Sequence, residues 1–92
     1  MKDLMQCREE IDEIDDKIIE LFEKRMQIAA EVAAYKKASG KAVFDKQREE
    51  EKLAAIEQKA SDAYFGRELR ELFSVIMSIS KKYQESLMNR KE

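Results

Sequence analysis

The amino-acid sequence predicts an all-α protein, because its composition favours helices and its apolar residues recur with the helical period. The 92 residues include no Pro and only two Gly, and 41% of them are charged. Chains with few helix breakers and abundant Glu, Lys, Leu, Ile and Ala form long helices, and the turn residues that separate strands are missing. At this length we expect one helical domain over residues 1–92.

The first predicted helix covers about residues 4–38 and carries the strongest pattern in the chain. Its mainly apolar positions are spaced alternately three and four residues apart, which is typical of an amphipathic helix with a heptad seam. We expect this helix to end near Ser39-Gly40, since glycine readily adopts the left-handed conformation that closes helices. The seam positions are Leu4, Cys7, Ile11, Ile14, Ile18, Leu21, Arg25, Ile28, Val32 and Tyr35.

Two shorter helices are predicted after this one, over about residues 46–59 and 62–89. Asp45 is a good N-cap for the second helix, and Ser61 or Asp62 for the third. The inner stripe of the third helix changes from apolar to polar toward its end. It reads Phe65, Leu69, Leu72, Phe73, Ile76, Met77, Ser80, Tyr83, Gln84 and Leu87.

The length of the first helix predicts an intertwined homodimeric helical bundle. A helix of about 35 residues is about 52 Å long, whereas a compact globule of this chain length is about 32 Å across. The overhanging part would expose apolar seam residues to water, and the two shorter helices are too few to cover them. A second copy related by two-fold symmetry is the commonest way to supply that cover.

The composition also excludes several classes of function. Basic and acidic residues nearly cancel, at 18 and 20, which argues against nucleic-acid binding. The chain has no His and one Cys, Cys7, so histidine chemistry, an intramolecular disulfide and a cysteine metal cluster are excluded. Without a membrane-length apolar run or a signal peptide, a reducing cytoplasm is the expected location.

Two cations on the first helix are the most informative residues. Arg25 occupies a seam position, and Lys36 lies about 20° around the helix from it and about 16 Å along it. The two side chains therefore face one side and can close on a small dianion. Taken singly, Arg25 also fits a register-setting residue or one that reaches out to water, and Lys36 fits a solvated helix end.

Other polar residues fall on the inner faces of the helices. Ser80 and Gln84 lie one turn apart in the third helix, where an inward amide needs hydrogen-bond partners. A satisfied hydrogen bond in the core remains an alternative for this pair. Glu49 fits either an inward carboxylate or a favourable helix-start charge, and Arg48 fits a surface ion pair with Glu51.

Arg8 lies beside the seam, about 25 Å along the helix from Arg25, too far to share a ligand within one chain. If two copies cross antiparallel near residue 19, Arg8 of one comes level with position 30 of the other. Considered alone, Arg8 fits an ordinary surface cation. Considered together, these groups predict a cationic cavity for a small, doubly negative molecule.

These residues resemble a known family, the all-helical chorismate mutases in their small single-domain form. The resemblance covers nearly the whole chain, and the order and spacing of its motifs are specific. The matching stretches are Arg8-Glu9-Glu10-Ile11-Asp12-Glu13-Ile14-Asp15, Leu21-Phe22-Glu23-Lys24-Arg25, Val32, Lys36, Val43-Phe44-Asp45, Arg48-Glu49, Ser80 and Gln84.

The resemblance implies the rearrangement of chorismate to prephenate, on the route to Phe and Tyr, without cofactor, metal or acid–base chemistry. Arg25 and a partner-donated Arg8 would grip the two carboxylates, and Lys36 and Gln84 would bind the ether oxygen. The other implied contacts are Glu49 and the Asp45 backbone at the ring hydroxyl, Arg48 and Ser80 at the ring carboxylate, and Val32 and Met77 as walls.

Two alternatives stay open at this point. An isochorismate pyruvate lyase of the same fold also uses cationic grips, although the segment from Asp45 to Arg48-Glu49 favours the mutase. A non-catalytic helical dimerisation or regulatory module would not need Arg25, Lys36 and Gln84 turned inward. Because the chain ends soon after the third helix, no fused domain is expected.

Overall fold

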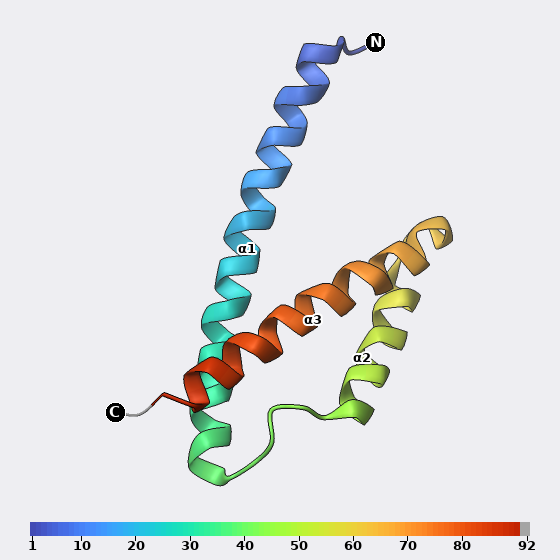
Figure 1. The fold of residues 1–92 in the computed structure, drawn as a ribbon. Helices are drawn as coiled ribbons and strands as arrows, with labels where there is room; N and C mark the ends of the chain where they lie inside the picture. Colours follow the sequence, from blue (N-terminus) through green and yellow to red (C-terminus); the bar gives the residue numbers. More distant parts are fainter. Residues whose placement is uncertain (91–92) are drawn as a thin grey trace.

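The computed structural model describes residues 1–90, which form three α-helices and one short 3-10 turn (Figure 1). The helices are α1 (Leu4–Ser39), α2 (Lys46–Lys59) and α3 (Gly66–Met88), and the 3-10 turn η1 (Ala63–Phe65) lies between the last two. No strand occurs in this part of the chain, so the predicted all-α class is confirmed. No helix within residues 1–90 combines the length and the apolar character needed to cross a bilayer.

Local capping explains where the first two helices begin and end. The Asp3 side chain accepts a hydrogen bond from the Gln6 backbone N–H at 2.8 Å, and the Gln6 side chain accepts one in return from the Asp3 N–H. Gly40 closes α1 with a left-handed φ of 73°, as predicted. Asp45 caps α2 by accepting from the Arg48 N–H at 3.1 Å, which is also as predicted.

The third helix begins later than predicted. Asp62 caps η1 by accepting from the Tyr64 N–H at 2.9 Å, and α3 proper starts only at Gly66. The tighter turn reverses the chain where α3 approaches α2 closely: a Cβ at Gly66 would lie 3.2 Å from the Glu57 carbonyl oxygen. The 3-10 turn thus coincides with a close contact between α2 and α3, which helical periodicity alone does not reveal.

The three helices make an open arrangement in which α3 packs against both of the others (Figure 1). The C-terminal half of α3 crosses the C-terminal half of α1, α2 lies beside the N-terminal half of α3, and the N-terminal half of α1 projects away. The radius of gyration is 16.8 Å, against about 12 Å for a compact chain of this length. The buried apolar residues are Ala29, Ala33, Leu53, Ile56 and Met77.

Most of the seam on α1 is uncovered by the rest of the chain. Its large apolar side chains are 54–64% exposed at Leu4, Ile11, Ile14, Ile18, Leu21, Ile28 and Tyr35. The residues that do pack beneath α3, Ala29 and Ala33, fall outside the seam, and their small side chains allow the two helices to approach closely. The seam is thus a long apolar stripe without a partner in its own chain.

Candidate active site

A cavity of about 370 Å³ opens where α1, the linker after it, α2 and α3 meet. Nine of the ten predicted substrate-binding residues line this cavity, although they come from segments far apart in the sequence. They are Arg25, Val32 and Lys36 on α1, Asp45, Arg48 and Glu49 around the start of α2, and Met77, Ser80 and Gln84 on α3.

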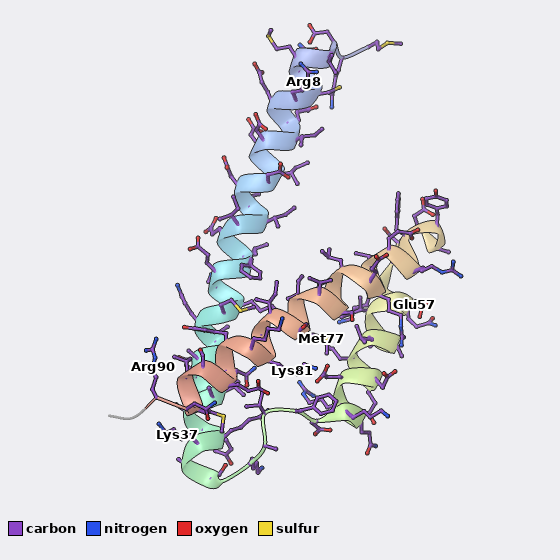
Figure 2. The ribbon with its side chains drawn as sticks, in the orientation of Figure 1. Arg8, Lys37, Glu57, Met77, Lys81 and Arg90 are labelled. Carbon is purple, nitrogen blue, oxygen red and sulfur yellow. The ribbon has the colours of Figure 1, made fainter. Side chains whose placement is uncertain are left out.

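Arg8 is the one predicted residue that the chain keeps apart from the others. It is exposed near the N-terminal end of α1, whereas Met77 and Lys81 lie on α3 near the cavity (Figure 2). The straight helix between Arg8 and Arg25 separates them by about 25 Å. Arg8 can therefore reach a cavity of this kind only on another copy of the chain.

The two α1 cations are held at the cavity wall. The Lys36 ammonium donates a hydrogen bond to the Val43 carbonyl oxygen at 2.9 Å, which ties the linker to α1. Both side chains are half-buried, and Arg25 forms no ion pair with any acid of residues 1–90. A lysine ammonium has three hydrogen-bond donors, so Lys36 still has donors available for a ligand. The guanidinium donors of Arg25 are also available to a ligand.

Ser80 and Gln84 form a buried polar pair on α3. The Gln84 amide nitrogen donates to the Ser80 hydroxyl oxygen at 3.0 Å, and the two residues are only 9% and 6% exposed, respectively. The Gln84 carbonyl oxygen Oε1 is buried without a hydrogen-bond partner within residues 1–90. The single hydrogen bond to Ser80 therefore leaves the buried amide of Gln84 incompletely satisfied.

The acidic side of the cavity lies at the start of α2. The Asp45 carboxylate is engaged in capping α2, while the Glu49 carboxylate Oε1 lies 3.3 Å from the Lys81 ammonium. The alternative reading of Arg48, a surface ion pair with Glu51, is not realised within residues 1–90, where Glu51 accepts a hydrogen bond from Gln47 at 3.2 Å. Arg48 is exposed at the rim of the cavity and is free to face a ligand.

Two lining cations, Lys52 and Lys81, were not among the predicted site residues. Each lies four residues after a predicted one, Lys52 after Arg48 and Lys81 after Met77, and that spacing places two side chains on the same helix face. This i, i+4 spacing was the signal in the sequence that could have placed Lys52 and Lys81 in the site.

The lining as a whole suits a small molecule with two negative charges. Five of its side chains are cationic, two are carboxylates, and Ile28, Ala29, Val32 and Met77 provide an apolar floor. Within residues 1–90 no three His, Cys, Asp or Glu residues gather closely enough to hold a metal ion. The Ser80 hydroxyl is hydrogen-bonded to an amide and not to a base, so it is not arranged as an activated nucleophile.

The fold and this site define an all-helical protein with a cationic pocket for a small dicarboxylate. The family model described as chorismate mutase type II matches residues 7–85, which is most of the chain. Comparison with curated proteins and with solved structures gives no match. The chain belongs to the type II chorismate mutase family, so its substrate class is chorismate and its function is that of a chorismate mutase.

The orphan carbonyl predicts that a Ser80→Ala/Gln84→Met double variant is at least as stable as the wild type. The two changes remove both partners of the buried pair together with the unsatisfied acceptor, and methionine keeps most of the volume of the glutamine side chain. Urea unfolding at one fixed protein concentration measures the free energy of unfolding. Ser80→Ala alone is the control, because it removes the partner of the buried Gln84 amide and should lower that free energy by about 1–3 kcal/mol. A double variant less stable than Ser80→Ala alone would contradict the proposed penalty.

Proposed function

We propose that the chain converts chorismate to prephenate, as an isomerase, by positioning and electrostatic stabilisation in this cavity. The observation that carries the proposal is the convergence of Arg25, Lys36 and Gln84 over an apolar floor. The reaction is a unimolecular pericyclic shift, so holding the enolpyruvyl arm over the ring removes conformational freedom before the barrier is reached. Fixed cations and amide donors then stabilise the charge that separates as the ether bond breaks.

At the ether end of the substrate, Lys36 and Gln84 are the proposed catalytic residues. The Lys36 ammonium retains donors beyond its bond to Val43, and the Gln84 amide has a second N–H beyond the one that binds Ser80. Both groups are held by the protein before substrate arrives, so little reorganisation is needed when negative charge grows on the ether oxygen. Arg25 is the proposed grip for a carboxylate, in the bidentate geometry that guanidinium favours.

At the ring end, we assign Glu49 and the backbone around Asp45 to the ring hydroxyl. Arg48 and Ser80 are assigned to the ring carboxylate, since Arg48 is exposed and pairs with no acid of residues 1–90, and Ser80 has a hydroxyl proton left to donate. Val32 and Met77, the latter buried at the cavity floor, are the proposed walls for the ring.

We further propose that the working enzyme is a homodimer. The chain exposes 7869 Å² of surface, about 2300 Å² more than a folded monomer of its 10.8 kDa mass is expected to expose. An excess of this size is comparable to what each subunit buries in an obligate dimer. In an antiparallel crossing of two seams, the partner subunit's Arg8 comes level with the span between Arg25 and Lys36 and supplies the second carboxylate grip.

The direct test is to follow chorismate disappearance and prephenate appearance with purified protein. Offering isochorismate in parallel separates a mutase from a lyase of the same fold, and the segment from Asp45 to Glu49 favours the mutase. Release of pyruvate from isochorismate without prephenate formation would overturn the proposal. Inactivity toward both substrates would favour the non-catalytic alternative.

Replacing Lys36 should slow the reaction far more than it weakens the fold. Lys36→Met keeps most of the side-chain stem but removes the ammonium, and losing one preorganised donor at a developing charge lowers the rate about 10²–10³-fold. Steady-state kinetics measures this loss. Lys37→Met is the matched control, since Lys37 is exposed and its ammonium bonds to the Arg90 carbonyl oxygen. Equal activity in the Lys36→Met and Lys37→Met variants would reject the assigned role.

The Gln84→Glu variant should acquire a pH dependence that the wild type lacks. An amide does not titrate, so the wild-type rate should be nearly level across neutral pH. The introduced carboxylic acid donates a hydrogen bond only when protonated, so activity should fall as pH rises. The test compares the pH dependence of the rate for the wild type and the variant, measured in the same buffers. A level profile in the variant would argue against contact between Gln84 and the ether oxygen.

Mixing Arg8→Ala chains with Arg25→Ala chains should restore activity if each site uses both subunits. Each heterodimer then contains one site with both arginines, so random exchange restores about a quarter of all sites. Activity is measured before and after a subunit exchange that is confirmed by mass. If no activity returns after confirmed exchange, Arg8 is not donated by the partner.

A further inference from the structure

Lys81 on α3 joins three separate segments at the cavity wall. Its ammonium lies 3.3 Å from the Glu49 carboxylate on α2 and 4.4 Å from the centre of the Phe44 ring in the linker (Figure 2 labels Lys81). An ammonium over an aromatic face is attracted by the ring electrons. The lysine is therefore held on one side by the ring and on the other by the carboxylate.

This ion pair differs from the other ion pairs of residues 1–90 in how far it is withdrawn from water. The Lys81 and Glu49 side chains are 31% and 22% exposed, whereas each of the other pairs includes a side chain at least 44% exposed. Water and salt therefore screen the pair less than they screen an ordinary surface pair. The contact can define where the Glu49 carboxylate points.

The contact also leaves part of Glu49 available. Lys81 engages Oε1, and no hydrogen bond to Oε2 is made within residues 1–90. A carboxylate has two oxygens that accept hydrogen bonds, so Oε2 can accept a hydrogen bond from a hydroxyl group of a ligand in the cavity. Four other cations line the same cavity, and within residues 1–90 Glu49 forms an ion pair with none of them.

We propose that Lys81 is a positioning residue that holds Glu49 in the orientation required to accept a hydrogen bond from the substrate's ring hydroxyl. The inference rests on the proposed function and deepens it, because it assigns a role to a lining cation to which the proposed substrate contacts give none. Phe44 contributes to the same positioning, since its ring limits where the Lys81 ammonium can lie.

A double-mutant cycle separates this positioning role from two others, in which Lys81 would act directly on the substrate or would only stabilise the fold. The four proteins are the wild type, Lys81→Met, Glu49→Gln and the double variant, and kcat/KM for chorismate is measured for each. Lys81→Met should lower kcat/KM about tenfold in the wild-type background and less than about twofold when Glu49 is already Gln. Lys81→Arg should recover most of the activity, because it keeps a cation within reach of Glu49.

The controls address folding and unspecific charge effects. Lys82→Met removes the same charge from the adjacent, exposed position and should change kcat/KM less than about twofold. Thermal unfolding of every variant shows which remain folded at the assay temperature. If Lys81→Met is not folded there, Lys81→Gln takes its place in the cycle.

Equal losses in both backgrounds would overturn the inference, because Lys81 would then act on the substrate or on the fold without Glu49. An unchanged kcat/KM for Lys81→Met would overturn it as well. A wild-type protein without mutase activity would instead overturn the proposed function, and this inference with it. An active wild type with additive losses would overturn the role of Lys81 alone.

Discussion

Five cationic side chains line one small cavity, and the fold has to hold them there against their mutual repulsion. Like charges repel one another, and the repulsion is stronger beside an apolar floor than in water. Their positions must therefore be imposed by rigid elements, and here they come from α1, α2 and α3. Glu49 offsets part of the charge through Lys81, and a doubly negative substrate offsets much of what remains.

One chain supplies most of this arrangement but little of the apolar burial needed to stabilise it. Its buried apolar residues are few, and α1 carries an exposed stripe along most of its length. Covering that stripe with a second copy would stabilise the fold and bring Arg8 to the cavity in a single step. In the proposed dimer, the 36-residue α1 of this 92-residue chain carries both the seam and Arg8, and a shorter α1 would lose part of the seam and the reach of its N-terminal end.

Features that depend on neighbouring residues could be predicted from the sequence, and features that depend on distant ones could not. The C-terminal end of α1 follows from Gly40, and the start of α2 follows from Asp45. Helix geometry predicts that Arg25 and Lys36 lie on the same face of α1. The 3-10 turn before α3 lies where Gly66 approaches Glu57, a contact between two helices that periodicity does not reveal. The spacing from Met77 places Lys81 on the cavity face, but its contacts with Glu49 on α2 and Phe44 in the linker join segments that no local pattern connects.

In the proposed homodimer, the cationic cavity works only when a second copy of the chain completes it. The most direct test is to measure chorismate turnover per chain across a dilution series, with the mass in solution determined at each point. Turnover should fall in step with the species of twice the 10.8 kDa chain mass. Full turnover by the single-chain species would contradict the dimeric site.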